Sequence, residues 1–322
     1  MKDKSKKKVL IIGAGISGIT FARSLPSDSF EVTLFDKSQG VGGRMATRRF
    51  QEGKWDHGVP WIESNLIPIE EKQAWLSVLK PVQGLSFPRL IAPEGLTQLP
   101  KSLCSGFSVY KGCKIVRLEI SNETSSWVIE DDKQGRYSGD ILILTLPAPQ
   151  ARELLLKSNL LESTGWDSFL SQIIYRPQMV ALGKSPASFH PLWKLTEEGP
   201  FDLILDNGKK GIEKSQGFFT GYLNTSFSRA HFEDSDETVL ELIRSQLKIQ
   251  FELEPEHLEI KRWRYSQTTH SLKEYFLIAK APLPLFFIGD GLAGGQLAGA
   301  IHSATKLAQH LKSFLNSQSQ TF

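Results

Sequence analysis

Cysteine is scarce in this chain, which excludes two classes of protein at once. The 322 residues contain only Cys104 and Cys113. Two cysteines build neither a disulfide scaffold nor an all-cysteine metal centre, and the seven histidines lack metal-binding spacing. We therefore expect no metal. Low cysteine use is typical of a reducing compartment, which favours a cytoplasmic protein.

Long apolar runs are also absent. No stretch of about 18 uncharged apolar residues occurs, so we expect neither a membrane-spanning helix nor a membrane partner. The lysine-rich start, Met1–Lys8, precedes an apolar segment and so resembles a secretory signal. However, Phe21–Ser24 offers only a poor cleavage site. We do not expect secretion.

The folded body carries little net charge. The formal charge is +3 and the pI is near 8.7. Met1–Lys8 holds five lysines and one aspartate, a net of +4, so the other 314 residues sum to −1. A nucleic-acid-binding protein carries basic charge on its folded domain. We therefore expect no nucleic-acid partner and a solvated basic tail.

The composition is that of an ordinary globular protein. Hydrophobic residues make up 40% and charged residues 23% of the chain. The length predicts about two domains.

The beginning of the chain predicts a dinucleotide-binding unit. Val9–Ile12 is a continuous apolar run, typical of a parallel strand that is buried on both faces. The turn Gly13–Gly18 follows with the spacing G-x-G-x-x-G, and then a predicted helix at Ile19–Leu25. A second predicted strand, Glu31–Phe35, ends on Asp36. This order is the dinucleotide fingerprint.

Each conspicuous residue of this unit has a physical reason. Gly13 permits a tight turn, Gly15 lets a pyrophosphate approach the backbone, and Gly18 lets the helix pack closely on the strand. The phosphates meet free N–H groups at the positive end of the helix. Asp36 can accept hydrogen bonds from both hydroxyls of an adenosine ribose.

The segment Gly42–Arg44 favours FAD over NAD. Two glycines just after the ribose acid let the backbone run close to phosphates, and Arg44 adds a positive charge. Taken alone, the segment fits a surface turn with a solvated arginine equally well.

Further motifs give these features a family resemblance. Trp55–Gly58 contains an Asp-His-Gly element, Arg262–Tyr265 reads Arg-Trp-Arg-Tyr, and a glycine-rich segment runs from Phe286 to Ala300. With the opening motifs, they resemble the flavin amine oxidase superfamily and, within it, the renalase-like group. The resemblance spans nearly the whole chain. It departs from the family at Asp36, where glutamate is usual, and at Val59–Ile62. The second departure leaves the lining of the substrate pocket, and therefore the substrate, undetermined.

The resemblance implies the fold and the cofactor. The expected architecture is α/β, with a doubly wound, glutathione-reductase-like FAD-binding domain and a mostly antiparallel α+β substrate domain. FAD would be bound non-covalently, because no cysteine lies near the last motif. The implied cofactor-binding residues are Gly13, Gly15, Ile16, Ser17, Gly18, Asp36, Lys37, Gly43, Arg44, His57, Gly58, Val116, Gly289, Asp290, Gly299 and Ala300.

The expected domains follow from the pattern of elements. Pro147 and Pro149 end an apolar strand and mark a boundary near residue 150. Residues 1–80, 90–150 and 281–322 are predicted to form a discontinuous FAD-binding domain, and residues 151–280 the substrate domain. The predicted strands cover 108–120, 126–131, 141–146, 178–182, 217–223, 258–265 and 285–288. The predicted helices cover 150–156, 238–251 and 296–314, and the second would bury Val239, Leu242, Ile243 and Leu247.

Aromatic residues are candidates for the walls of a planar substrate pocket. They are Trp61, Trp193, Trp263 and Tyr265, for each of which core packing is an equal alternative. Arg262 and Arg264 could contact substrate phosphates or remain solvated. Asp56 and His57 are neighbours on a strand and point to opposite faces, so we expect no acid–base pair between them.

The expected activity is therefore that of an FAD-dependent oxidase. The resemblance implies hydride transfer from a small planar donor, an isomer of dihydronicotinamide dinucleotide, with dioxygen as acceptor and hydrogen peroxide as product. An amine oxidase is the first alternative. A carotenoid-type desaturase is disfavoured because no amphipathic membrane-docking segment is evident, and a flavin-free binding protein on the same fold is the alternative from another class. No catalytic side chain and no oligomeric state follow from the sequence.

Overall fold

The computed structural model describes residues 6–82, 88–186, 193–195, 199–279 and 283–319. Two compact units divide the chain. The first comprises Met1–Gly43, Leu103–Ile174 and Thr268–Phe322, and the second Arg44–Ser102 and Tyr175–Gln267. These units place residues 44–102 with the later segment, whereas the predicted domains place most of them with the first. Which residues bind cofactor and which bind substrate stays a prediction.

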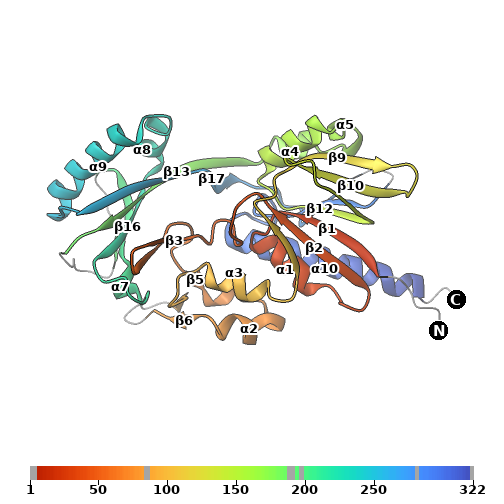
Figure 1. The fold of residues 1–322 in the computed structure, drawn as a ribbon, viewed down its shortest axis with the longest axis horizontal. Helices are drawn as coiled ribbons and strands as arrows, with labels where there is room; N and C mark the ends of the chain where they lie inside the picture. Colours follow the sequence, from red (N-terminus) through yellow and green to blue (C-terminus); the bar gives the residue numbers. More distant parts are fainter. Residues whose placement is uncertain (1–5, 83–87, 187–192, 196–198, 280–282, 320–322) are drawn as a thin grey trace. The chain divides into compact units, whose positions relative to one another are not determined.

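A six-stranded sheet forms the centre of the first unit (Figure 1), in the order β18-β19-β12-β1-β2-β8. Its neighbouring strands are parallel except for the edge pair β18–β19. The bounds are β1 Lys7–Ile12, β2 Phe30–Asp36, β8 Ser108–Lys111, β12 Ile141–Leu144, β18 Leu277–Ile278 and β19 Leu285–Phe287. The predicted return of the chain to this sheet near residue 285 is confirmed.

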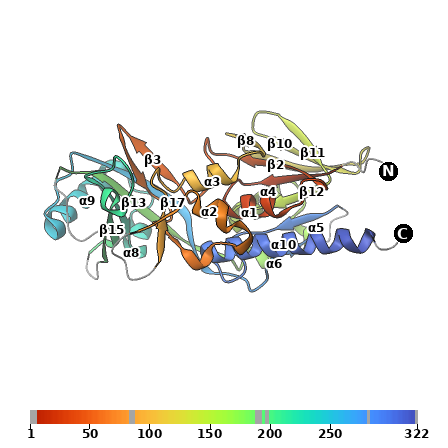
Figure 2. The ribbon, with the colours of Figure 1, turned by 90° about the horizontal axis from the view of Figure 1, so that it is seen from below.

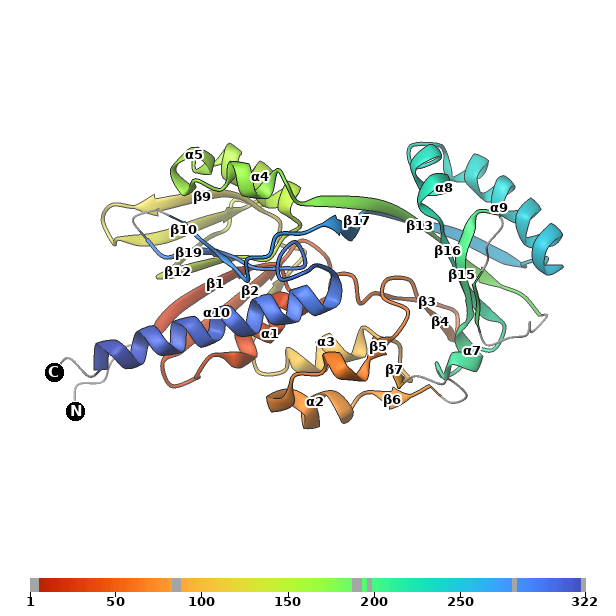
Figure 3. The same ribbon diagram turned by 180° about the vertical axis from the view of Figure 1, so that it is seen from behind.

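Helices cover one face of this sheet, and a second, smaller sheet covers the other. Helices α1 (Ile16–Ser24) and α10 (Gln296–Ser319) pack side by side (Figures 2 and 3). On the opposite face lies the antiparallel sheet of β9 (Ile115–Ser121), β10 (Ser126–Asp131) and β11 (Arg136–Gly139). Helix α4 (Ala148–Lys157) packs against β9 and is followed by α5 (Leu161–Thr164) and α6 (Asp167–Leu170).

The apolar pattern of the opening strand explains the core of the first unit. Val9–Ile12 is buried, as a strand covered on both faces must be. Gly18 permits the close approach of α1, because a Cβ atom there would lie 2.3 Å from the Gly13 carbonyl oxygen. Both predictions are confirmed.

A five-stranded sheet organises the second unit, in the order β14-β15-β16-β13-β17. The pairs β14–β15, β15–β16 and β13–β16 are antiparallel, as predicted. Helices α8 and α9 lie on one face (Figure 3), above a core that includes Phe201, Phe219 and Ile243. The bounds are β13 Ile174–Lys184, β14 Trp193–Leu195, β15 Phe201–Asp206, β16 Phe218–Leu223, β17 His257–His270, α8 Thr225–Ala230 and α9 Asp236–Phe251.

A second apolar cluster joins this sheet to the hairpin of β3 (Thr47–Phe50) and β4 (Gly53–Asp56). It is centred on Trp55, Phe218 and Tyr222. The remaining elements of the unit are β5 Ile62–Glu63, β6 Lys80–Pro81, β7 Arg89–Ile91, α2 Lys72–Leu76, α3 Gln98–Leu103, α7 Asn207–Lys210 and two short 3₁₀ turns, Ser64–Leu66 and Ile69–Glu71.

Three local expectations need correction. The predicted strand 108–120 is two strands, β8 and β9, because the chain turns at Gly112 with φ +60°. Leu242 is 40% exposed and does not share the buried face of α9. Lys7 and Lys8 extend β1 by pairing with β2, so the basic segment is not wholly a solvated tail.

None of the helices in the described residues is long and apolar enough to cross a membrane.

Candidate functional site

Four strands of the first unit end at one edge of its sheet. Ile12 of β1 is in register with Phe35 of β2 and with Leu144 of β12, and Leu144 is in register with Phe287 of β19. The loops that follow these strands therefore start side by side. In open α/β sheets, ligands bind at this carboxyl edge.

The glycine-rich turn after β1 is built around Gly13. Its φ of +111° lies in the region that favours glycine, and a Cβ atom would lie 2.3 Å from Thr145 Oγ1. The Thr145 hydroxyl donates to the carbonyl oxygens of Ile12 and Gly13, at 3.0 Å each. Thr145 thus fixes the turn. Sequence reasoning missed this residue, because a threonine at the end of an apolar strand is not distinctive.

The start of α1 has the chemistry of an anion-binding site. Gly15 is its N-cap and makes no side-chain capping bond, and a Cβ atom on Gly15 would meet nothing within 4 Å. The first N–H groups of a helix need partners from outside the helix. Ser17 Oγ is buried and has no hydrogen-bond partner within the described chain. A phosphate against this turn would satisfy all these donors, so the residues fit the diphosphate of a dinucleotide.

The second glycine segment lies directly beside the first. The Gly42 N–H donates to the Ala14 carbonyl oxygen at 2.7 Å, and Gly15 and Gly42 form an isolated parallel bridge. Gly42 and Gly43 have φ of +106° and +54°, so both use glycine's freedom. The structure therefore brings together two motifs that are 24 or more residues apart in the chain.

Asp36 ends β2 next to this turn. Its Oδ2 accepts a hydrogen bond from the Ala14 N–H at 2.9 Å, and its Oδ1 accepts one from the Ser38 N–H at 2.8 Å. A carboxylate has about four lone-pair sites, so capacity for ribose hydroxyls remains. The Cys113 N–H donates to the Asp36 carbonyl oxygen at 2.9 Å, which places the start of β9, with Val116, beside this strand end. Lys37 is exposed.

The loop after β19 carries the other predicted cofactor residues. Asp290 is 5% exposed, and Thr268 Oγ1 donates to its Oδ2 at 2.7 Å and to its carbonyl oxygen at 2.9 Å. A Cβ atom on Gly299 would lie 2.4 Å from the Leu292 carbonyl oxygen, so the close approach of α10 to this loop requires glycine. Ala300 is buried in the same turn. Thr268 is a further residue that the sequence did not indicate.

The Asp-His-Gly segment belongs to the second unit, where hydrogen bonds fix its backbone. The N–H groups of His57 and Val59 donate to the carbonyl oxygens of Ala46 and Arg44, at 2.9 and 2.8 Å. A Cβ atom on Gly58 would lie 1.7 Å from the Arg44 carbonyl oxygen, so only glycine allows this crossing. Trp263 Nε1 donates to the His57 carbonyl oxygen at 2.7 Å.

His57 is held as a neutral imidazole. Burial, helped by the positive charge of Lys261, lowers the pKa of His57 from 6.5 to about 4. Its ring stacks on Trp263 with centroids 5.4 Å apart, and its buried Nδ1 has no hydrogen-bond partner within the described chain. The carboxylate of the neighbouring Asp56 binds Thr47, Leu96 and Lys210, as described below.

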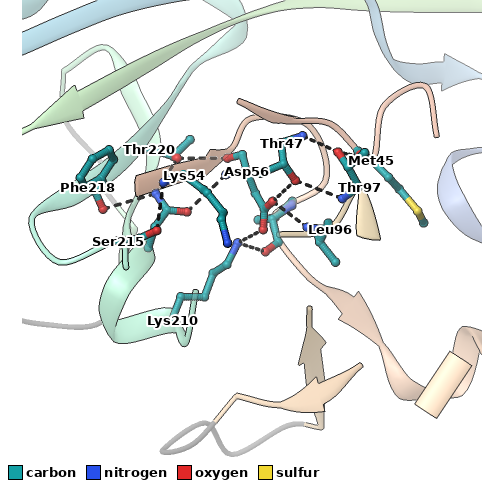
Figure 4. A network of polar contacts seen from close by, with 12 residues as sticks. Met45, Thr47, Lys54, Asp56, Leu96, Thr97, Lys210, Ser215, Phe218 and Thr220 are labelled. Carbon is teal, nitrogen blue, oxygen red and sulfur yellow. Dashed lines mark hydrogen bonds and ion pairs between the residues drawn. The ribbon is translucent and has the colours of Figure 1, made fainter. Parts of the chain in front are cut away.

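Asp56 and Lys210 form an ion pair in the interior of the second unit (Figure 4). Lys210 Nζ lies 2.8 Å from Asp56 Oδ2, and the two side chains are 2% and 0% exposed. Lys210 Nζ also donates to the Pro60 carbonyl oxygen at 2.8 Å. Asp56 Oδ1 accepts hydrogen bonds from Thr47 Oγ1 at 2.7 Å and from the Leu96 N–H at 2.8 Å. Nothing in the sequence singled out Lys210.

Two of the four predicted aromatic walls share one apolar cluster. Trp61 and Trp263 pack on the cluster around Trp55, and the Arg89 guanidinium lies 4.0 Å from the centre of the Trp61 ring. Tyr265 meets Tyr175 edge-on at 5.7 Å. The side chain of Trp193 lies outside the described residues. Whether these rings line a pocket stays a prediction.

Three arginines on or next to β17 have partners within the protein. Arg44 Nη1 donates to the carbonyl oxygens of Tyr265 and Ser266, at 3.2 and 3.1 Å. Arg262 pairs with Asp236 and donates to two backbone carbonyl oxygens, and Arg264 pairs with Glu233 at 2.8 Å. Arg262 was expected to contact either a substrate phosphate or solvent, and its ion pair with Asp236 is neither of these.

No group of three or more acidic, histidine or cysteine side chains that could hold a metal ion occurs among the residues that the structure describes.

Comparisons with known proteins define the class to which this fold and site belong. The family model described as flavin containing amine oxidoreductase matches residues 67–312, and the model described as NAD(P)-binding Rossmann-like domain matches residues 11–76. The chain therefore belongs to the flavin-containing amine oxidoreductase family and is a flavin-dependent oxidoreductase.

Among individual proteins, it is similar to renalase from Mus musculus, with 24% identity over 96% of this chain and 99% of that protein. Polyamine oxidase 4 from Oryza sativa subsp. japonica is 39% identical, but only over 20% of this chain and 14% of that protein. A solved structure described as a putative protoporphyrinogen oxidase from Exiguobacterium sp. 255-15 has the same fold. Its TM-score is 0.69 at 13% identity, over 95% of this chain and 99% of that one.

Proposed function

We propose that this protein binds FAD non-covalently and uses it to oxidise a small planar hydride donor. One observation carries the cofactor proposal: the glycine turn at Gly15 has an open side, and beside it the buried hydroxyl of Ser17 has no hydrogen-bond partner among the described residues. A diphosphate supplies the negative oxygens that these donors need. In this proposal Asp36 binds the adenosine ribose, and the loop with Asp290 binds the ribityl chain or flavin end of the cofactor.

The remaining predicted contacts belong to the same proposal. They are Lys37, Gly43, Arg44, His57, Gly58, Val116, Gly289, Gly299 and Ala300. The dipole of α10, whose N-terminus follows the glycine-rich loop after Asp290, would favour the negative charge that reduced flavin carries.

The chemistry demands little from side chains. Bound FAD would supply a hydride acceptor, and the residues of this chain would orient the donor carbon towards it. The donor would lose a hydride, which is two electrons and one proton. Dioxygen would take up the two electrons, this proton and one proton from water, and leave as hydrogen peroxide.

A dihydronicotinamide-dinucleotide isomer is the donor that we favour. The likeness to mouse renalase along 96% of the chain supports a renalase-like reaction, and aromatic rings such as Trp263 would suit a flat ring. An amine is the second candidate, because the family model and the polyamine oxidase match name that chemistry.

A visible spectrum and a choice of donors test the proposal. The purified protein, with FAD added, should show bound oxidised flavin. A protein that stays colourless after FAD is added and unbound ligand is removed would refute the cofactor assignment. Anaerobic mixing with borohydride-generated dihydronicotinamide isomers should then bleach the flavin, and readmitted air should restore the colour and yield peroxide. Bleaching by monoamines or polyamines alone would replace the favoured donor with an amine.

A further inference from the structure

The ion pair between Asp56 and Lys210 does more than cross-link the second unit. Replacing a buried ion pair by apolar side chains is often neutral or stabilising, so stability alone is a weak reason to bury one. Lys210, however, reaches two points of a single short segment: the Asp56 carboxylate and the Pro60 carbonyl oxygen. His57 lies between these two points.

Further hydrogen bonds hold the backbone on both sides of His57. The Asp56 carbonyl oxygen accepts hydrogen bonds from Thr220 Oγ1 at 3.0 Å and from the Tyr222 hydroxyl at 3.4 Å (Figure 4 shows the first). The His57 N–H and carbonyl oxygen are both used, as described above. These contacts fix the backbone of segment 56–60 at both ends and in its middle, and stacking on Trp263 orients the His57 ring.

The imidazole of His57 has a polar atom whose hydrogen-bonding capacity is unused. Its buried Nδ1 has no partner within the described chain, and a buried polar atom without one costs free energy. A neutral imidazole can donate or accept one hydrogen bond at each ring nitrogen, depending on its tautomer. The ring also stacks on Trp263, one of the predicted substrate walls.

His57 is also one of the predicted contacts to FAD. We propose that its ring, beyond that packing contact, hydrogen-bonds the nitrogen-bearing group of the bound donor, such as a carboxamide, and that Lys210 is the positioning residue that holds His57 for this contact. The inference rests on the proposed function, since it needs a bound hydride donor. A donor misplaced by about 1 Å can lose about a hundredfold in rate, so fixing the segment has a direct consequence for hydride transfer.

The test uses the FAD-bound protein and variants that separate folding from positioning. Lys210→Met alone leaves the Asp56 charge buried and unpaired, which can prevent folding. The double variant Asp56→Asn with Lys210→Met removes both charges while the amide oxygen still accepts from Thr47 and Leu96. His57→Phe keeps the ring on Trp263 but removes both nitrogens. Glu94→Gln is the matched control. It removes one charge of another ion pair, in which Glu94 lies 2.5 Å from Lys54 of β4.

We expect the double variant to melt near the wild-type temperature and to bind FAD normally. Its limiting rate of flavin reduction should fall about tenfold or more. His57→Phe should show a comparable loss. Oxidised nicotinamide adenine dinucleotide has no hydride to transfer and serves as the unreactive probe. We expect it to bind roughly fivefold more weakly to both variants than to the wild type, as for one lost hydrogen bond. Glu94→Gln should behave like the wild type.

Combining the variants decides whether Lys210 acts through His57. If it does, adding His57→Phe to the double variant changes the rate by less than about twofold, because the contact is already lost. Losses that multiply, or a double variant that reduces flavin at the wild-type rate, would overturn the inference. Wild-type protein that fails to bind FAD or to react would instead refute the proposed function, so the two failures are distinct.

Discussion

At the scale of single residues, the candidate site depends on two features. Some buried polar atoms lack hydrogen-bond partners in the described chain, and some glycine positions have no space for a side chain. Ser17 Oγ and His57 Nδ1 are buried polar atoms without hydrogen bonds in the described chain. Gly58 leaves no space for a Cβ atom, whereas Gly15 leaves open space on its Cβ side. The motif glycines therefore have different reasons to be glycine, and substitution can distinguish them.

The low pKa of His57 makes a prediction about pH. Burial lowers this pKa from 6.5 to about 4, so between these values the unfolded chain binds a proton that the folded protein does not. The contribution of His57 to stability is therefore complete above about pH 6.5 and declines as the pH falls towards 4. We expect urea unfolding to show a steeper loss of stability over this range in the wild type than in His57→Phe. Equal slopes would contradict the burial of the neutral ring.

Gly15→Ala should weaken FAD binding without unfolding the protein. Its φ of −76° suits alanine and no atom lies within 4 Å of the new Cβ, but the methyl group occupies the side from which a phosphate approaches. We expect the FAD dissociation constant to rise about tenfold while the melting temperature changes little. Gly40→Ala is the control, because Gly40 also has open space. Equal FAD affinity in both variants would place the diphosphate elsewhere.

At the scale of elements, the apolar pattern of a helix predicts its buried face where the helix packs on a single core. Helix α9 buries Val239, Ile243 and Leu247, whose spacing predicted one apolar face. Leu242 is 40% exposed, although the same pattern included it. A stripe of apolar residues can be wider than the surface that covers it, and only the neighbouring sheet sets the limit.

Two alanine substitutions in α9 measure this limit. Ile243→Ala should cost about 2–5 kcal/mol of unfolding free energy, because it empties space in a fully buried position. Leu242→Ala should cost less than about 1 kcal/mol, since its side chain is partly in water already. Chemical denaturation of both variants gives the comparison. Similar losses would mean that Leu242 is covered in solution.

At the scale of the whole molecule, the distribution of charge carries little information about the cofactor. Met1–Lys8 accounts for the positive net charge, and the body is at −1. The diphosphate, in our proposal, meets N–H groups and a helix end rather than a basic surface. Lys7 and Lys8 nevertheless belong to β1, where they pair with Phe30 and Glu31.

Truncation separates these two roles of the basic segment. Removing residues 1–6 should leave FAD affinity unchanged in a spectroscopic titration, because β1 and its glycine turn remain whole. Extending the deletion through Lys8 should lower the melting temperature, since it removes two paired residues of β1 and the hydrogen bond from Lys8 N–H to Asp140 at 2.7 Å. A loss of FAD binding in the shorter deletion would show that the tail takes part in binding.

The amino-acid sequence by itself determined the opening strand–turn–helix unit, the return of the chain at β19 and the family. These features depend on local patterns: short apolar runs, glycine spacing and a strand-end acid, each of which acts within a few residues. Only the tertiary structure decided which distant residues hydrogen-bond or pair with the residues of these motifs. It brought Thr145 to Gly13, Thr268 to Asp290 and Lys210 to Asp56 across large sequence separations. A hydrogen bond or ion pair between residues that are far apart in the chain produces no repeating pattern in the sequence. The two residues meet only because the strands and loops that carry them pack together.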